Sequence, residues 1–390
     1  MNIESLDAAL SKVRTPFYWY DLSLFSATIK ACNESSSTYG FHVHYALKAN
    51  FNDPILDLIA ASGMGADCVS GNEVRKAVER GFPSEKIVFA GVGKSDWEME
   101  EALDLDIFAF NCESIEELQV LNELAVSKNK VARVAIRINP NVNANTHHYI
   151  TTGLNENKFG VNTADLERVI SVLRESKNLS FLGLHFHIGS QITDMEVFKN
   201  LCIRVNELTA WFEARNFPVH MLNVGGGLGI DYHEPLKNTI PDFKTYFSIF
   251  HKYLELKPLQ QVHFELGRSL VAQCGNLISK VLYIKKGIST NFAIIDAGMT
   301  ELIRPALYQA WHDIANLTAD ASTMKSETAV GEVYDIVGPI CESSDLFRKA
   351  VELPETRRGD MLIIRSAGAY GQVMTSGYNL RKAAETVYSG

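Results

Sequence analysis

The sequence predicts an α/β protein: a (β/α)8 TIM barrel with a second, β-rich domain that resembles a β-barrel. From Phe41 onward, short β-branched apolar segments alternate with stretches of helical periodicity. Eight such segments fit within roughly 230 residues, close to the ~250 residues typical of this barrel. After about residue 270, strand-like runs are separated by Gly and Pro, and few helical stretches intervene.

The predicted elements follow one another along the chain. The barrel strands are Phe41–Leu47, Ala66–Val69, Ile87–Ala90, Ile107–Phe110, Ala132–Asn139, Phe181–Ile188, Val219–Val224 and Val262–Leu266. The helices between them are Pro54–Ala61, Glu73–Glu79, Ser95–Ala102, Ile115–Leu124, Leu166–Leu173, Met195–Ala214 and Phe243–Leu256. The later strands are Leu277–Lys285, Asn291–Asp296, Ala329–Val337 and Met361–Arg365, with Ser322–Thr328 as a polar loop. We therefore assign residues 25–268 to the barrel, and residues 1–24 and 269–390 to the β-rich domain.

Composition narrows the function classes. The 390 residues carry a formal net charge of −9 without a long basic run, which disfavours nucleic acids and anionic membranes as partners. No segment approaches the ~18 unbroken apolar residues that a membrane span requires. The six cysteines are widely spaced, and the acidic start of the chain does not resemble a signal peptide. We expect reduced cysteines, a cytoplasmic location and a small-molecule partner.

Residues that end the barrel strands are the first candidates for catalysis, because reacting groups in this fold lie at the carboxyl ends of the strands. The first strand ends at Lys48. A lysine at a barrel mouth can form a Schiff base, and partial burial favours the neutral amine that does so. On position alone, a solvated lysine is the alternative.

Glycines and an arginine follow the last two strands. Gly225, Gly226 and Gly227 can expose backbone N–H groups to a phosphate, and Gly267 precedes Arg268. Barrel enzymes frequently bind phosphate with these two loops. The glycines do not match a dinucleotide fingerprint, and Gly93-Lys94-Ser95 lacks the first glycine of a Walker A motif.

Two histidine pairs favour a competing function. His185 and His187 are predicted on one strand face, and His42 and His44 repeat this spacing. Such pairs can bind a metal, so a metal-dependent barrel hydrolase is an alternative, although further ligands are not evident at the later strand ends. Hydrogen-bonded core histidines explain each pair equally well.

The candidates together suit pyridoxal 5′-phosphate. Glu265 can keep the pyridine nitrogen protonated, so that the ring accepts electrons from a substrate carbanion. His187 can lie against the ring, while Ser190, the three glycines and Arg268 bind the phosphate. Taken singly, Glu265 could form a strand-end salt bridge and Ser190 could cap a helix.

The chain resembles the fold-type III pyridoxal-phosphate decarboxylases over nearly its whole length. The motifs that carry the resemblance are Tyr-Ala-Leu-Lys48-Ala-Asn, His185-Phe-His187-Ile-Gly-Ser190-Gln, Gly225-Gly-Gly227, Glu265-Leu-Gly-Arg268, Ile303-Arg304-Pro-Ala-Leu-Tyr308, Gly338-Pro-Ile-Cys341-Glu342-Ser and Gly368-Ala-Tyr370. The resemblance implies that Lys48 carries the cofactor, that Cys341 donates a proton after carbon dioxide leaves, and that Tyr370 reaches the cofactor phosphate. It also implies that the substrate is bound by Arg268, Arg304, Tyr308, Glu342 and Tyr370.

The resemblance further implies a homodimer in which each barrel receives the partner's Cys341–Glu342 segment. The implied reaction converts meso-2,6-diaminopimelate to L-lysine and carbon dioxide; another basic amino acid or a carboxylated polyamine is the alternative substrate. Leu266 stands where the family commonly has proline, and Leu380-Arg381-Lys382 replaces an arginine-rich stretch. We expect Leu266 to have little effect on the site.

Overall fold

The computed structural model describes residues 3–142, 158–319 and 331–389, and the chain forms two compact units. The barrel unit comprises Ile29–Gly229 and Asp242–Gly267, and the β-rich unit comprises Met1–Thr28, Ile230–Pro241 and Arg268–Gly390. The sequence-based division assigns residues 230–241 to the barrel. They group with the β-rich unit, where Tyr232 hydrogen-bonds Arg268. The predicted loop Ser322–Thr328 and the start of the predicted strand Ala329–Val337 lie outside the described residues.

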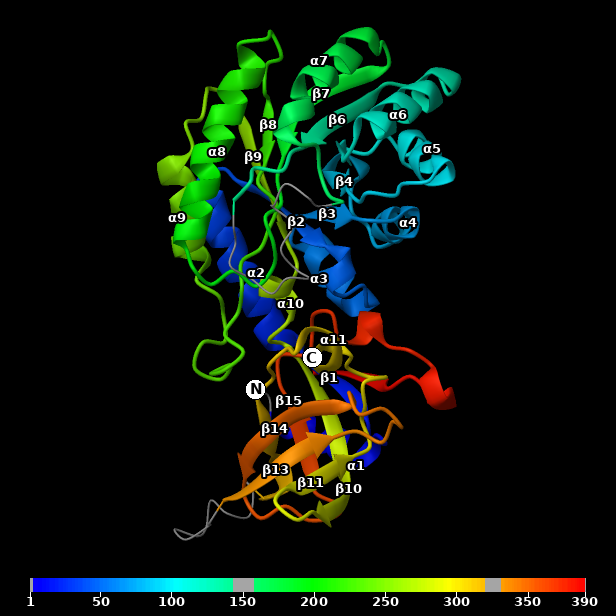
Figure 1. Cartoon of the computed structure of the whole chain (residues 1–390), viewed down its shortest axis with the longest axis vertical. Coiled ribbons are helices and arrows are strands. Elements are labelled where there is room, and N and C mark those ends of the chain that lie inside the picture. The colour runs from blue at the N-terminus through cyan, green and yellow to red at the C-terminus, as the bar shows by residue number, and fades with distance from the viewer. Residues whose placement is uncertain (1–2, 143–157, 320–330, 390) are drawn as a thin grey trace. The chain divides into compact units, whose positions relative to one another are not determined.

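Eight parallel strands close the barrel in chain order, which confirms the predicted fold (Figure 1). They are β2 (His42–Ala46), β3 (Gly65–Cys68), β4 (Ile87–Phe89), β5 (Ala109–Cys112), β6 (Ala132–Arg137), β7 (Leu179–His185), β8 (Met221–Asn223) and β9 (Gln261–Leu266). Closure is made by β2 and β9, where Tyr45 is in register with Leu266. Because the strands are parallel, all their carboxyl ends lie at one mouth of the barrel.

Helices connect the barrel strands. They are α2 (Leu22–Ser37), which leads into the barrel, then α3 (Asp53–Ala61), α4 (Gly71–Glu79), α5 (Asp96–Asp104), α6 (Ile115–Ser127), α7 (Leu166–Glu175), α8 (Glu196–Glu213) and α9 (Phe243–Tyr253). Short 3₁₀ turns occur at Leu47–Ala49, Ser84–Lys86 and Thr163–Asp165.

Three successive strand-to-helix turns contain the same serine–glutamate capping pattern. The serines that precede α4, α5 and α6 are followed three residues later by glutamate, as Ser70/Glu73, Ser95/Glu98 and Ser114/Glu117. Each glutamate accepts a backbone N–H from the residue at or just before its serine, at 2.7–2.9 Å. These capping arrangements satisfy the exposed N–H groups at the helix starts and fix the turns at the barrel mouth.

The β-rich unit is built on one mixed sheet. Its strands are β1 (Phe17–Asp21), β10 (Gly275–Lys286), β11 (Asn291–Ile295), β12 (Ile314–Asn316), β13 (Glu332–Val337), β14 (Leu346–Leu353), β15 (Met361–Ile364) and β16 (Glu385–Ser389). Its helices are α1 (Ile3–Lys12), α10 (Arg268–Val271) and α11 (Arg304–Tyr308), with 3₁₀ turns at Gln372–Met374 and Tyr378–Leu380. The sheet order is β12-β15-β10-β11-β13-β14, and β1 pairs with β10 and β16.

Four of these strands, β1, β12, β14 and β16, were not predicted. β1 is buried throughout because it lies between β10 and the C-terminal β16, where Phe17 pairs with Ile278 and Glu385. Phe17 and Trp19 also pack with Leu6 of α1 and Ile363 of β15. Pairing between the two ends of a chain leaves no local sequence signal.

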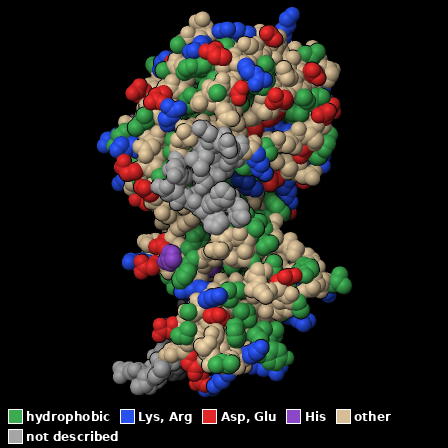
Figure 2. Space-filling view, in the orientation of Figure 1, with side chains coloured by type: hydrophobic (Ala, Val, Ile, Leu, Met, Phe, Trp, Pro, Cys, Tyr) green, Lys and Arg blue, Asp and Glu red, His purple; other side chains and the backbone are tan. Residues whose placement is uncertain are grey.

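Acidic and basic side chains are intermixed on the face of the molecule shown in Figure 2. Among the helices that the structure describes, none has both the length and the apolar character needed to cross a bilayer.

Candidate active site

A buried carboxylate, Glu265, lies at the centre of the barrel's polar interior. Its Oε1 atom accepts hydrogen bonds from the amides of Asn111 (2.9 Å) and Asn223 (2.7 Å), and Oε2 lies 3.0 Å from His185 Nε2. These side chains come from β5, β8, β7 and β9. Burial opposes ionisation, but His185 and the charge of Lys48 hold the pKa of Glu265 well below its usual range. Glu265 is therefore a fixed anion.

Lys48 lies directly after β2, in the 3₁₀ turn Leu47–Ala49, and its side chain is 37% exposed. Its Nζ atom is 3.4 Å from Oδ2 of the buried Asp67 on β3. Burial and the negative charge of Glu265 raise the pKa of Asp67 to about 6, although Lys48 favours its ionised form. The amine thus stands at the barrel mouth with a carboxylate beside it.

His187 lies in the loop after β7 rather than on the strand. Its Nδ1 atom accepts a hydrogen bond from the Gly226 backbone N–H at 3.3 Å, which places any ring proton on Nε2. Burial, together with the positive charges of Lys48 and Arg137, lowers the pKa of His187 well below its usual value. The ring is neutral at physiological pH, and it can contact a flat apolar group.

The glycine-rich loop after β8 packs against its neighbours without space for side chains. Gly225 has a left-handed φ of 68°, and a Cβ atom on Gly226 would lie 2.0 Å from the Glu265 carbonyl oxygen. Ile192 donates its N–H to the Gly227 carbonyl at 2.8 Å, so the loop that contains the half-buried Ser190 runs beside the glycines. This arrangement brings together the predicted phosphate-binding residues of the barrel unit.

Gly267 ends the barrel segment. A Cβ atom at this position would lie 2.9 Å from Ala49 Cβ and 3.2 Å from Ala46 Cβ, so glycine allows β9 to end against the turn that carries Lys48. Leu266, in place of the family proline, is buried in β9.

In the β-rich unit, two buried arginines form a cluster with neutral groups. Arg268 Nη1 donates to the Tyr232 hydroxyl at 2.7 Å, and its guanidinium lies 4.8 Å from the centre of the Tyr370 ring. Arg304 donates to His312 Nε2 at 2.8 Å and lies 4.9 Å from the Tyr232 ring. These contacts place two positive charges beside neutral acceptors and aromatic rings, which suits an anionic ligand.

Two tyrosines complete this part of the predicted site. Tyr308 is half-buried at the end of α11 and contributes with Tyr232 and Tyr370 to the raised pKa of Arg268, which burial opposes. Tyr370 has a left-handed φ of 55°, an uncommon conformation for a residue with a bulky side chain.

Cys341 and Glu342 lie in the connection between β13 and β14 and are exposed. The Tyr378 hydroxyl donates to Glu342 Oε1 at 2.9 Å. Within the described residues, no hydrogen bond joins this exposed group to the arginine cluster. The β-rich unit therefore presents the predicted proton donor and the predicted acid on its surface.

Only one of the two predicted histidine pairs lies within a single strand, since His42 and His44 are both in β2. β7 ends at His185, so His187 does not share its strand face; His185 binds Glu265 and His187 accepts from Gly226. His42 and His44 lie in the amino-terminal part of β2, whereas Lys48 follows the carboxyl end of the same strand. In the part of the chain that the structure describes, no group of three His, Cys, Asp or Glu side chains is arranged to hold a metal.

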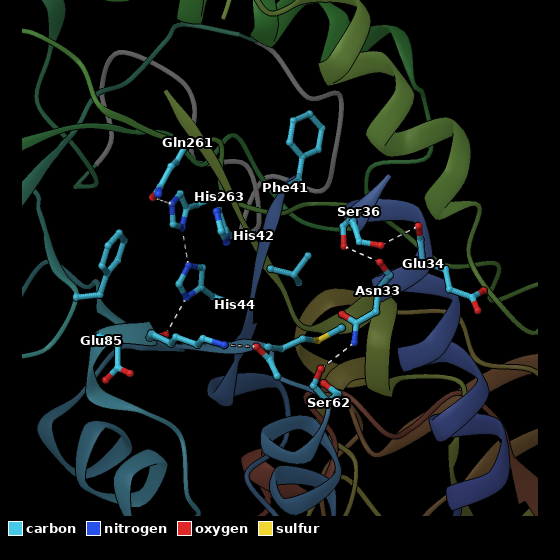
Figure 3. A pocket seen from close by; sticks show the side chains of 17 residues that line it. Asn33, Glu34, Ser36, Phe41, His42, His44, Ser62, Glu85, Gln261 and His263 are labelled. Carbon is cyan, nitrogen blue, oxygen red and sulfur yellow. Dashed lines mark hydrogen bonds between the residues drawn. The ribbon is translucent and has the colours of Figure 1, made fainter. Parts of the chain in front are cut away.

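A cavity of about 510 Å³ occupies the amino end of the barrel (Figure 3). His44 and His263 join across it through a 2.8 Å bond between Nε2 and Nδ1, and His44 Nδ1 donates to the Lys86 carbonyl at 3.0 Å. His42 stacks on His263 with ring centres 4.7 Å apart. Because a carbonyl only accepts, His44 carries a proton on Nδ1. Burial lowers the pKa of His44, so Nε2 is unprotonated and accepts from His263.

The Walker-like motif has a structural role. Lys94 is buried and donates to Glu117 at 2.7 Å and to the carbonyls of Gly91 and Asn111, while Ser95 caps α5. No phosphate-binding function is needed to explain it.

Sequence reasoning missed several residues around the site. Asp67 and Asn111 are each the last but one residue of a barrel strand, and a search of every strand end would have found them. Asn223 is the last residue of β8. Tyr232 and His312 lie in irregular segments, and no local pattern marks them.

Comparison with known proteins gives a consistent result. Residues 26–272 match the model of the pyridoxal-dependent decarboxylase family, pyridoxal binding domain. A diaminopimelate decarboxylase from Bacteroides thetaiotaomicron is 57% identical over 371 residues, which cover 95% of this chain and 94% of that relative. One from Aquifex aeolicus is 39% identical, covering 96% and 86%. The crystal structure of diaminopimelate decarboxylase from Helicobacter pylori complexed with L-lysine is similar, with a TM-score of 0.91, 38% identity, and coverage of 99% and 94%.

The buried histidines at the amino end predict a loss of stability in acid. Burial lowers the pKa of His44 from 6.5 to about 4. Between these values the unfolded chain binds a proton that the folded protein does not, so the free energy of unfolding falls as pH falls, by about 2 kcal/mol at pH 5. Denaturant unfolding at pH 7.5 and pH 5 should show this drop, and His44→Gln should reduce it. His220→Gln, at an exposed histidine of the barrel unit, is the control; an equal drop in wild type and His44→Gln would contradict the prediction.

Proposed function

The chain belongs to the pyridoxal-dependent decarboxylases, and on this basis we propose that it is a carboxy-lyase that converts meso-2,6-diaminopimelate to L-lysine and carbon dioxide. The chemistry rests on one observation: the ionised Glu265 is held rigidly inside the barrel whose mouth carries Lys48. The substrate is supported by the curated relatives and by the arginine cluster, which offers two positive charges to a carboxylate.

Pyridoxal 5′-phosphate is the proposed cofactor, and the barrel residues fit it. Asp67 Oδ1, Asn111 Oδ1 and His185 Nδ1 are buried around Glu265 without a hydrogen-bond partner among the described residues, as expected where a polar group is to be bound. The residues that would hold it are Lys48, His187, Ser190, Gly225, Gly226, Gly227, Glu265, Gly267, Arg268 and Tyr370. When bound, the cofactor supplies an electron sink for the carbanion left at the substrate α-carbon.

The protein's own groups orient this chemistry. Lys48 would hold the cofactor covalently through its amine, with Asp67 able to take up and return its proton. Glu265 would keep a proton at the ring nitrogen, because an anion fixed by three donors stabilises a cationic N–H. His187 would contact the ring as a neutral imidazole. Backbone N–H groups of the glycine loop would meet the phosphate.

Substrate recognition is assigned to the β-rich unit. Arg268, Arg304 and Tyr308 would bind the carboxylate at the far end of the substrate, and Glu342 its far ammonium. A substrate with charged groups at both ends is selected when each charge meets a fixed partner. Tyr378 supports this role by fixing one oxygen of Glu342. Cys341 would donate its thiol proton to the α-carbon after carbon dioxide leaves.

The proposed enzyme is a homodimer with shared active sites. Cys341, Glu342 and Tyr378 are exposed on the β-rich unit, which supports a role in completing the site of a partner subunit. The cytoplasmic location expected from the sequence remains a prediction.

Lys48→Ala is expected to abolish the formation of L-lysine from meso-diaminopimelate, at least 1,000-fold, because no other amine would hold the cofactor. Chromatographic detection of the product and the visible absorbance of lysine-bound pyridoxal in the purified protein provide the measurements. Lys86→Ala, at an exposed lysine of the same unit, is the control. Appreciable turnover in Lys48→Ala, or conversion of another amino acid in preference, would overturn the assignment.

Glu265→Gln is expected to lower kcat roughly 100-fold or more while the barrel remains folded, since glutamine keeps the shape and loses the charge. The Asn111 and Asn223 amides can still donate to the remaining oxygen. Steady-state kinetics and thermal unfolding would be compared with Glu255→Gln, an exposed glutamate of the barrel unit. Wild-type kcat in Glu265→Gln would show that the buried charge is structural only.

Mixing two inactive variants tests the shared active site. In the proposed dimer, each active site combines Lys48 of one subunit with Cys341 of the other subunit. The Lys48→Ala and Cys341→Ala variants therefore each supply the residue that the other lacks. After random reassociation, half of the dimers are mixed and each has one intact site, so about a quarter of wild-type activity should return. Each variant mixed with itself is the control. If no activity returns although the subunits exchange, Lys48 and Cys341 act in the same subunit. Activity of Cys341→Ala mixed with itself would show that Cys341 is dispensable.

A further inference from the structure

The Arg304 guanidinium in the β-rich unit is held by an uncharged histidine. Arg304 begins α11 and is buried, and its Nη1 atom donates to His312 Nε2 at 2.8 Å. Eight residues of continuous helix would separate these positions by about 12 Å. The helix instead ends at Tyr308, and the left-handed φ of 52° at the next residue, Gln309, turns the chain back, so that His312 reaches Arg304.

The second ring nitrogen of His312 is also used. His312 Nδ1 lies 2.8 Å from the Arg365 backbone carbonyl, which can only accept a hydrogen bond. The proton is therefore on Nδ1, and Nε2 offers a lone pair to Arg304. Both contacts agree on a single tautomer, and burial together with the Arg304 charge lowers the pKa of His312 to about 3. The ring is neutral throughout the physiological range.

The acceptor for His312 is fixed by its own surroundings. Arg365 directly follows β15, and its backbone N–H donates to the Asp313 carbonyl at 2.9 Å. Its side chain pairs with the Asp313 carboxylate at 2.6 Å. The ring of Tyr232 lies edge-on to His312 with centres 5.3 Å apart. The imidazole is thus held on three sides, and its hydrogen bond to Arg304 has one orientation.

The charge of the acceptor matters for an arginine that binds substrate. A carboxylate in the place of His312 would orient Arg304 equally well, but would neutralise it and weaken its attraction for another anion. A neutral imidazole fixes one N–H and leaves the positive charge available. The same logic applies to Tyr232, whose hydroxyl accepts from Arg268.

We propose that His312 is a positioning residue that holds the Arg304 guanidinium, still fully charged, for the far carboxylate of the substrate and product. This inference rests on the proposed function and adds a determinant of selectivity to it. Decarboxylation removes the carboxylate next to the reacting amine, so the product L-lysine retains the far one. Cadaverine has the same diamine chain without that carboxylate, and the two compounds isolate the contribution of Arg304.

Binding of L-lysine and cadaverine to the holoenzyme, measured by calorimetry, tests the proposal. His312→Asn keeps a donor near the Arg365 carbonyl and removes the acceptor for Arg304, so L-lysine should bind about 10- to 100-fold more weakly. Cadaverine binding should change less than about threefold. The KM for meso-diaminopimelate should rise with that loss, whereas kcat should change much less.

Two further variants separate positioning from structure. His312→Gln places an uncharged oxygen near the position of Nε2 and should recover most of the affinity for L-lysine. His312→Glu supplies an oxygen with a negative charge and should bind L-lysine as weakly as His312→Asn, or more weakly. If His312→Asn does not fold, the comparison of Gln with Glu, which differ only in charge, decides.

The outcomes are distinct from those that test the proposed function. A wild-type enzyme that forms no L-lysine from meso-diaminopimelate would refute the function itself. If the wild type is active and His312→Asn retains wild-type affinity for L-lysine, only the role of His312 is refuted. Equal weakening of L-lysine and cadaverine would also refute it, because a general structural defect does not discriminate between the two ligands.

Discussion

The interaction on which the site depends is the set of hydrogen bonds to Glu265. A carboxylate inside a barrel is costly unless its oxygens are satisfied, and three other strands each provide one partner. These hydrogen bonds require the closed barrel. Asn111, His185 and Asn223 reach Glu265 only because their strands meet around one axis. The ionised state of Glu265 therefore depends on the closed barrel. Lys48 and Asp67 lie near this fixed negative charge.

The two units solve the problem of buried charge in opposite ways. In the barrel, neutral amides and a histidine surround an anion; in the β-rich unit, Tyr232 and His312 surround cations. The neutral partners named here orient each charge without cancelling it, so the charge can attract a ligand group of opposite sign. In a structural salt bridge, such as Lys94 with Glu117, the two charges neutralise each other, and the pair stabilises only the turn in which it lies.

The parts of the site that could be predicted are those tied to strand ends. Lys48 and Glu265 were predicted because reacting groups of a parallel barrel lie at the carboxyl ends of its strands, and Asp67 was within reach of the same reasoning. The roles of Cys341, Glu342 and Tyr370 came only from family motifs. His312 could not have been predicted, since its partner Arg304 is reached through a single left-handed residue, Gln309. The pairing of Phe17 with Glu385 was hidden for a similar reason: it depends on long-range packing, not on local pattern.

The course of the chain between the units also limits how the gene can be divided. The polypeptide passes from one unit to the other at residues 28/29, 229/230, 241/242 and 267/268. A fragment that contains only residues 26–272, the part that matches the family model, would include the segment Ile230–Pro241 with Tyr232. It would lack Arg304 and His312. Such a fragment would expose an aromatic segment deprived of its packing, so recombination between relatives is better tolerated when both units are inherited together.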